Sequence, residues 1–230
     1  MDYTYSDIAK MIDHSLLNPT LSDREVEAGC LLAREYGVAS ACAKPYHLRM
    51  CANLLAGSSV AASTVIAFPH GGNATATKLA EAELALHDGG AELDAVINIG
   101  KALSEDWDYV RREIRALAEL THGGGAILKV IFENHYLQDR HKIRLCEICG
   151  EVGADFVKTS TGYAAGGATL DDLRLMRRHS PPHVRIKAAG GVRSLDALLE
   201  VRAIGVARSG ATRTAEMLDD CKRRLATPVT

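Results

Sequence analysis

The sequence lacks the long apolar runs of a membrane protein. No stretch approaches the roughly 18 consecutive apolar residues that a transmembrane helix needs. The first residues, MDYTYSDIAK, carry acids where a secretory signal peptide has basic residues. These absences argue against a membrane function and predict a cytoplasmic protein.

An excess of charge of either sign is also missing. The 27 Lys and Arg residues and the 29 Asp and Glu residues give a formal net charge of -2 at pH 7. Such a chain has no global field to attract nucleic acid or an anionic membrane surface. We therefore expect no nucleic-acid partner, and an anionic ligand must be bound by local groups.

Disulfide frameworks and metal-binding motifs are absent as well. The six cysteines lie mostly within helical or strand patterns and lack the dense spacing of a disulfide scaffold. Cys146 and Cys149 form one C-x-x-C pair in a helical pattern, which favours structural thiols over metal or redox chemistry. None of the nine histidines belongs to a cluster with metal-ligand spacing.

What the sequence has is an alternation of short β-branched runs with longer amphipathic runs. Strands are predicted at residues 10–17, 38–44, 59–68, 92–99, 126–132, 155–160, 184–189 and 205–210. Eight strands are the number that closes a parallel barrel, whereas the G-x-G-x-x-G fingerprint of a doubly wound sheet is absent. The sequence therefore predicts a single-domain α/β protein, a TIM (β/α)8 barrel over residues 1–230. A helix end and a tail are expected over about residues 221–230.

Helices with recognisable ends separate these strands. Apolar positions recur every three to four residues over 23–36, 78–87, 107–120, 139–152 and 169–178. Ser22 with Glu25, and Thr169 with Asp172, stand at capping-box spacing, and Gly37 follows the first of these helices. Each helix is expected to turn one apolar face toward the strands.

Three lysines interrupt the apolar strand patterns. Lys129, Lys158 and Lys187 lie at equal spacing near the ends of three successive strands. Burying an ammonium costs several kcal/mol unless something compensates, and burial and neighbouring cations both lower a lysine pKa. A lysine deprotonated in this way can form a Schiff base with a carbonyl, and Asp94, an acid in another apolar strand, could transfer the protons. The alternative interpretation is that each of these charged residues forms a salt bridge or extends its charged group to solvent at the end of its strand.

Glycines follow the last predicted strands. Gly162, the Gly190–Gly191 pair and Gly210 stand at strand exits, and Thr212 follows with a hydroxyl. The loops after strands 7 and 8 of a TIM barrel often bind phosphate through backbone N–H groups. The alternative to a phosphate site is that these glycines are needed only to form the turns after the strands.

Several motifs of the sequence resemble those of a known family. DFVKTSTGYAAGGAT, ELDAVINIG, LKVIFE, RIKAAGGVR and AFPHG resemble those of the deoxyribose-phosphate aldolases, and the likeness covers nearly the whole chain. The resemblance implies a class I aldolase with a TIM barrel and no metal or cofactor. It implies reversible cleavage of 2-deoxy-D-ribose 5-phosphate to D-glyceraldehyde 3-phosphate and acetaldehyde, so the partners are small sugar phosphates and aldehydes.

The resemblance also implies a role for individual residues. Lys158, in VKTSTG, matches the Schiff-base lysine, and Lys187 would lower its pKa and join Asp94 in proton transfer. Lys129 would hold Asp94 ionised. Two further residues would line the same pocket, Asp13 and Cys42. Phosphate would be bound at the matching positions Gly162, Gly190, Gly191, Gly210 and Thr212.

Three positions depart from the family pattern. Lys44 stands where a neutral side chain is usual, Tyr163 where some members have lysine, and Arg213 where serine is frequent. Arg213 is expected to strengthen phosphate binding through a bidentate contact. The departures leave open a related lysine aldolase acting on another sugar or sugar phosphate. A non-catalytic sugar-phosphate-binding barrel is a further alternative, and a homodimer is compatible with a fold of this size.

Overall fold

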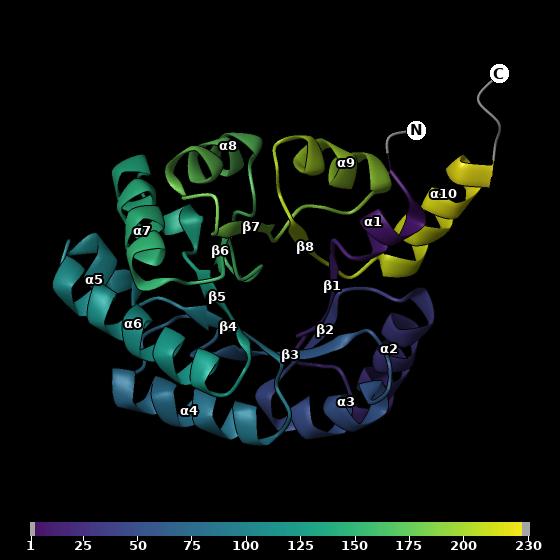
Figure 1. Cartoon of the computed structure of the whole chain (residues 1–230), viewed down its shortest axis with the longest axis horizontal. Helices are drawn as coiled ribbons and strands as arrows, with labels where there is room; N and C mark the ends of the chain where they lie inside the picture. The colour runs from purple at the N-terminus through teal and green to yellow at the C-terminus, as the bar shows by residue number, and fades with distance from the viewer. Residues whose placement is uncertain (1–2, 227–230) are drawn as a thin grey trace.

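Eight parallel strands form a closed barrel in the computed structural model, which describes residues 3–226. Strand β1 pairs with both β2 and β8, which closes the ring (Figure 1). The strands are β1 (Ile12–Leu16), β2 (Ser40–Ala43), β3 (Ala61–Ile66), β4 (Glu92–Val96), β5 (Ile127–Ile131), β6 (Phe156–Lys158), β7 (Arg185–Ala188) and β8 (Arg208–Ala211). Each overlaps one predicted run, and the predicted TIM barrel is confirmed.

Helices surround this ring. They are α1 (Tyr5–Ala9), α2 (Asp23–Tyr36), α3 (Leu48–Leu55), α4 (Thr75–His87), α5 (Ile99–Leu103), α6 (Trp107–Gly123), α7 (Asp139–Val152), α8 (Leu170–His179), α9 (Leu195–Ala203) and α10 (Thr214–Ala226), with short 3-10 turns η1 (Pro45–His47) and η2 (Asn134–Tyr136). The predicted capping box of Ser22 and Glu25 is formed, Thr169 caps α8, and Gly37 ends α2 at φ +63°. Of the expected C-terminal segment, residues 221–226 complete α10 and residues 227–230 lie outside the described part.

None of the helices within residues 3–226 is long and apolar enough to cross a membrane.

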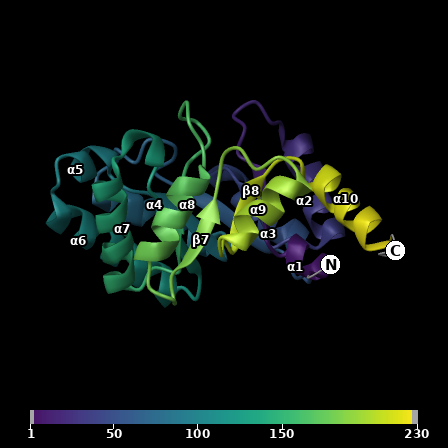
Figure 2. The same ribbon diagram turned by 90° about the horizontal axis from the view of Figure 1, so that it is seen from above.

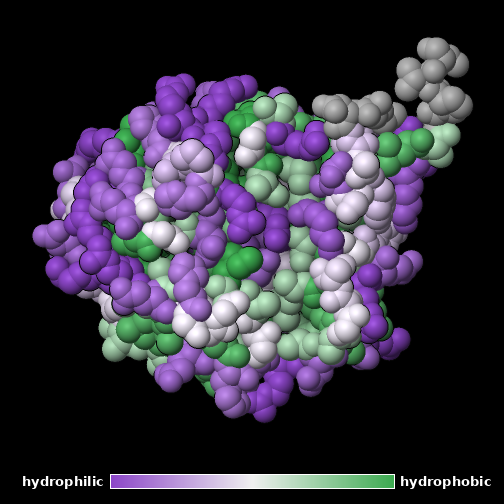
Figure 3. Space-filling model, in the orientation of Figure 1, coloured by the Kyte–Doolittle hydropathy of each residue, from purple (hydrophilic) through white to green (hydrophobic). Residues whose placement is uncertain are grey.

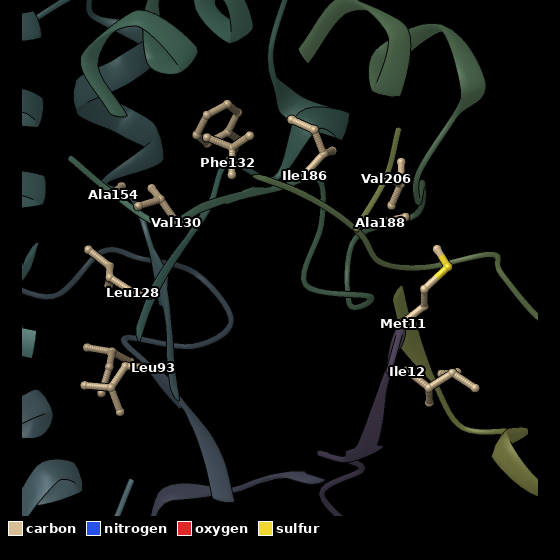
Figure 4. Close-up of a cluster of buried hydrophobic side chains, with 14 of the residues drawn as sticks. Met11, Ile12, Leu93, Leu128, Val130, Phe132, Ala154, Ile186, Ala188 and Val206 are labelled. Carbon is tan, nitrogen blue, oxygen red and sulfur yellow. The ribbon is translucent and has the colours of Figure 1, made fainter. Parts of the chain in front are cut away.

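The apolar core lies between the strands and the helices. Successive strand residues point to opposite faces, so Leu93 and Leu128 point outward from the ring, as Figure 4 shows. Their neighbours Asp94 and Lys129 are fully buried on the inner face, where they contact each other. The interior of this barrel is therefore charged where the outside of the strands is apolar.

A buried ion pair outside the barrel fixes the carboxyl end of β4. Lys78 Nζ donates to Glu113 Oε1 at 2.7 Å and to the carbonyl oxygen of Val96 at 2.8 Å. The same Glu113 oxygen accepts from the backbone N–H of Asn98 at 3.2 Å. This network ties α4 and α6 to the strand that carries Asp94, and it shows that a buried lysine in this chain can be purely structural.

Candidate active site

Charged side chains from six strands meet inside the barrel. Asp94 lies at their centre, because its Oδ1 accepts from Lys129 Nζ at 2.8 Å and its Oδ2 accepts from both Lys158 Nζ and Lys187 Nζ at 2.7 Å. The strand register explains this convergence, since Asp94 is paired with Lys129 across β4 and β5, and Lys158 with Lys187 across β6 and β7. The cluster comprises Asp13, Glu92, Asp94, Lys129, Lys158, Lys187 and Arg208.

Lys129 and Asp94 form the permanently ionised part of this cluster. Lys129 Nζ lies 2.6 Å from Glu92 Oε2 and 3.3 Å from Asp13 Oδ2, in addition to its contact with Asp94. Burial lowers the pKa of Lys129, but these carboxylates raise it well above its ordinary value. Burial likewise raises the pKa of Asp94, and the three lysines more than reverse this and hold it well below 3.8. Lys129 therefore stays an ammonium and Asp94 a carboxylate.

Lys158 and Lys187 differ in the number of carboxylates they contact. Lys187 Nζ lies 2.5 Å from Asp13 Oδ2 and 2.7 Å from Asp94 Oδ2, and the two carboxylates raise its pKa although burial opposes them. Among the described residues Lys158 contacts one carboxylate, through the Asp94 oxygen that Lys187 also uses. Burial, with the Lys187 charge, lowers the pKa of Lys158 despite the attraction of Asp94. Of the three barrel lysines, Lys158 is held closest to the free amine.

A pocket of about 230 Å³ is formed over these amines, and Lys158, Lys187, Asp13 and Cys42 line it. It lies at the carboxyl ends of the strands, the end at which TIM barrels carry their active sites. Burial, followed by the nearby Asp94 charge, raises the pKa of the Cys42 thiol. Asp94 and Lys129 are absent from the lining, so they lie beneath the amines that a ligand can reach.

The five glycine and threonine positions expected at the phosphate come together on the rim of this pocket, namely Gly162, Gly190, Gly191, Gly210 and Thr212. Gly190 and Gly191 have φ values of +77° and +106°, which side chains other than glycine rarely allow. A Cβ atom on Gly190 would lie 3.0 Å from the Cα atom of Gly167. Close packing of the loops after β6 and β7 thus requires glycine at this edge of the pocket.

Arg213 is not among the residues that line the pocket. Its side chain is 55% exposed, and its Nη1 lies 3.5 Å from Glu216 Oε2 in the first turn of α10. The position of the side chain therefore favours Glu216 over the pocket, and the expected contact of Arg213 with phosphate stays a prediction. Arg193, in the loop between β7 and α9, lines the pocket in its place. Arg193 was not predicted from the sequence, although its position two residues after the glycine pair in AAGGVR was an available signal.

Tyr163 joins two loops at the mouth of the pocket. Its hydroxyl donates to the carbonyl oxygen of Leu17 at 2.7 Å, and its ring meets the Phe68 ring edge-on with centroids 5.3 Å apart. The loops that follow β1 and β6 project from the same face of the molecule in Figure 2, purple and green respectively. Tyr163 and Leu17 also line a second, more apolar pocket with Lys44. Lys44 donates to the carbonyl oxygens of Asn18 and Leu21, so its charge is held outside the pocket over Lys158.

Within residues 3–226 no group of three or more His, Cys, Asp or Glu side chains is arranged to hold a metal ion. Cys146 and Cys149 are both fully buried and free, as expected of structural thiols.

A closed (β/α)8 barrel with a lysine-lined pocket at the carboxyl ends of its strands has the architecture of a TIM-barrel enzyme. The chain belongs to the DeoC/LacD family of aldolases, whose sequence model matches residues 8–214. It is therefore an aldolase, a carbon–carbon lyase that acts on small molecules.

Individual relatives agree with this assignment. The chain is 61% identical over 227 residues to a deoxyribose-phosphate aldolase of Rhodopirellula baltica, which covers 99% of this chain and 94% of that protein. It is 41% identical over 218 residues to a deoxyribose-phosphate aldolase of Caldanaerobacter subterraneus, covering 94% of each. The deoxyribose-phosphate aldolase of Aeropyrum pernix, described as a tetramer, superposes with a TM-score of 0.87 at 29% identity and covers 95% of this chain and 92% of that one. The expected relationship to deoxyribose-phosphate aldolases is confirmed.

Proposed function

We propose that this aldolase reversibly cleaves 2-deoxy-D-ribose 5-phosphate to D-glyceraldehyde 3-phosphate and acetaldehyde through a Schiff base on Lys158. The observation that supports this most is the uneven distribution of carboxylates inside the barrel. Lys129 and Lys187 each contact at least two carboxylates, whereas Lys158 shares one oxygen of Asp94. Burial lowers the pKa of Lys158 at this pocket, and a lysine with a lowered pKa is the group best suited to add to an aldehyde, because the free amine is the nucleophile.

The steps follow from the positions of Lys158 and Lys187. The amine of Lys158 adds to the C1 aldehyde, and the Lys187 ammonium gives the proton with which the C1 hydroxyl leaves as water. The resulting iminium withdraws the electrons of the C2–C3 bond, while the neutral Lys187 accepts the proton of the C3 hydroxyl. Glyceraldehyde 3-phosphate leaves, and Lys187 returns the proton to C2 of the enamine. Water then hydrolyses the iminium to release acetaldehyde and regenerate Lys158.

Asp94 and Lys129 support these proton transfers from beneath. Asp94 Oδ2 lies 2.7 Å from Nζ of both reacting lysines, so it stabilises whichever of them carries the proton. Lys129, 2.8 Å from the other oxygen, keeps the carboxylate ionised throughout. Asp13 completes the set, because its contact with Lys187 keeps that amine the stronger base of the pair.

Reductive trapping tests this proposal directly. The protein is mixed with 2-deoxyribose 5-phosphate, borohydride is added, and modified peptides are mapped by mass spectrometry. An ethyl group on Lys158 is the expected product, since it reports both the nucleophile and the two-carbon donor. Folded protein that consumes the substrate without any lysine adduct would rule out the Schiff-base mechanism.

Arg193 and the glycine rim are proposed to bind the phosphate group. We expect Arg193→Gln to raise KM for 2-deoxyribose 5-phosphate roughly tenfold to a hundredfold with little change in kcat, because one charge-assisted contact is lost. KM for unphosphorylated 2-deoxyribose should stay the same. Arg213→Gln is the matched control, since that guanidinium lies against Glu216. Equal KM values for both sugars in the unchanged protein would instead favour an aldolase for another substrate.

Lys187→Leu is expected to move the pH dependence of Schiff-base formation upward. Removal of its charge takes away a repulsion that lowers the pKa of Lys158, so Lys158 keeps its proton to higher pH. The acid limb of kcat/KM should therefore shift to higher pH, in addition to a loss of kcat from the missing proton donor. An acid limb at the same pH as in the unchanged protein would mean that the two amines are not coupled.

A cytoplasmic location, a homodimer and the single-domain boundaries at residues 1–230 stay predictions from the sequence.

A further inference from the structure

Arg208 and Glu92 lie below the reacting amines, near the amino-terminal mouth of the barrel. Arg208 Nη2 lies 3.0 Å from Glu92 Oε1, and its Nη1 lies 2.6 Å from Asp13 Oδ1. Neither Arg208 nor Glu92 lines the pocket over Lys158. Figure 1 looks into the amino-terminal mouth, and Figure 3 shows hydrophilic residues gathered near its centre, over β7 and β8. The pair therefore has no direct contact with a ligand in the pocket.

The charges inside the barrel do not balance when every group is ionised. The buried interior of the described barrel contains four bases and three carboxylates: Lys129, Lys158, Lys187, Arg208, Asp13, Glu92 and Asp94. Arg185, an exposed cation at the start of β7, faces Arg208 and Glu92 from the edge of this set. An excess charge in a closed interior of low dielectric is costly, and the loss of one proton from a base removes it. Arginine cannot lose its proton in a protein. The excess must therefore be relieved at a lysine.

The contacts of Arg208 determine which of the lysines loses its proton. Arg208 donates to Asp13 Oδ1 and to both oxygens of Glu92. Lys129 also contacts Glu92 Oε2, and Lys187 contacts Asp13 Oδ2. Lys158 is left with a share of one Asp94 oxygen. The titratable groups facing Lys158 are Asp94 from β4, Lys187 from β7 and Cys42 from β2. Arg208 reaches it through Asp13, Lys187 and Asp94 in sequence.

We propose that Arg208 is a positioning residue for the Schiff-base chemistry: its fixed positive charge, balanced by Glu92 and Asp13, keeps Lys158 as a free amine. The inference rests on the proposed role of Lys158 as nucleophile. It assigns a function to two residues that touch neither substrate nor the reacting atoms. It also explains why an ion pair is retained inside the barrel, where apolar side chains would fill the space at no cost in desolvation.

The proposal predicts shifts of opposite sign for the two members of the pair. Arg208→Gln removes a positive charge, so Lys158 should hold its proton to a pH about one unit higher. Glu92→Gln removes a negative charge, so Lys158 should lose its proton about one unit lower. The double variant restores the balance and should return close to the midpoint of the unchanged protein. Arg208→Lys keeps the positive charge, so its midpoint should also lie close to that of the unchanged protein.

The readout is the initial rate of acetaldehyde trapping at Lys158 with cyanoborohydride, followed by peptide mass spectrometry across the acidic and neutral pH range. The midpoint of this profile reports the amine, whereas a purely structural role of the ion pair would lower the amount of active protein without moving the midpoint. The proposal would be overturned if the midpoints of the two single variants shifted in the same direction, or if neither midpoint shifted. If Arg208→Gln does not fold, Glu92→Gln and Arg208→Lys decide it by the same criteria.

The same experiment separates this proposal from the one on which it rests. A missing Lys158 adduct in the unchanged protein at every pH would overturn the Schiff-base mechanism and the role of Arg208 with it. A Lys158 adduct whose midpoint is the same in all variants would overturn the role of Arg208 alone.

Discussion

Lys158→Leu is expected to lower kcat for 2-deoxyribose 5-phosphate cleavage by roughly 10⁴-fold or more while the chain keeps its fold. The substitution removes the amine that forms the iminium, and no other described lysine at the pocket can replace it, because Lys187 is held as an ammonium by Asp13 and Asp94. Stability should change little, since Asp94 keeps its contacts with Lys129 and Lys187.

The measurement compares turnover and thermal unfolding of Lys158→Leu with those of Lys222→Leu. Lys222 lies on α10 with a side chain 55% exposed, so its removal deletes a lysine without touching the barrel interior. We expect the control to retain full activity. Cleavage by Lys158→Leu at more than about a hundredth of the normal rate would assign the nucleophile to another group.

The residues of the site that could be predicted from the sequence are those that break an apolar pattern. Asp94, Lys129 and Lys187 each stand between buried aliphatic neighbours, and a charge in such a place is conspicuous. Equal spacing in successive strand–helix units also indicated that the lysines occupy equivalent strand positions. The pairing of Lys158 with Lys187 across β6 and β7 agrees with this. Lys129 is instead paired with Phe156, two residues below the partner of Lys158 on β5.

Glu92 and Arg208 escaped prediction because each is the first residue of its strand. A charge at the start of a strand looks like an ordinary solvated strand end, and only closure of the barrel brings the two side chains together. For loops, too, the sequence does not show which side chains come together, as Arg193 and Arg213 illustrate. Both follow a strand and its glycines, and the sequence does not reveal that Glu216 attracts Arg213 while Arg193 lines the pocket.

The structure shows why, of the three barrel lysines, Lys158 alone has a lowered pKa. Burial and neighbouring cations were both expected to lower a lysine pKa, but these effects act on all three lysines. In the barrel, burial is the largest cause at Lys158, with the Lys187 charge second among the groups that lower its pKa. Carboxylates overcome burial at Lys129 and Lys187, where the pKa rises instead. The distribution of carboxylates, not the spacing of the amines, distinguishes the three lysines.

Asp94→Asn is expected to cost both stability and activity. The neutral amide leaves Lys158 without a carboxylate and removes one from Lys129 and Lys187, so buried cations lose compensation. Breaking a buried charge network in this way typically lowers the free energy of unfolding by about 3–5 kcal/mol. We expect kcat to fall roughly 10²-fold to 10⁴-fold, because proton transfer between Lys158 and Lys187 loses the group that both contact.

The pH dependence of this stability difference follows from the direction of the Asp94 pKa. In the folded chain that pKa lies well below 3.8, so the stabilisation from the carboxylate is fully present above this value and is lost as the pH falls toward the folded pKa. Urea unfolding of the unchanged protein and of Asp94→Asn should therefore differ most near neutral pH, and the difference should shrink below pH 3.8. Asp171→Asn makes the same chemical change on a side chain that is 96% exposed, and it should show no such dependence. A difference between Asp94→Asn and the unchanged protein that stays constant into acid would mean that Asp94 is not the ionised centre of the barrel, since a protonated carboxyl and an amide would then serve the lysines equally.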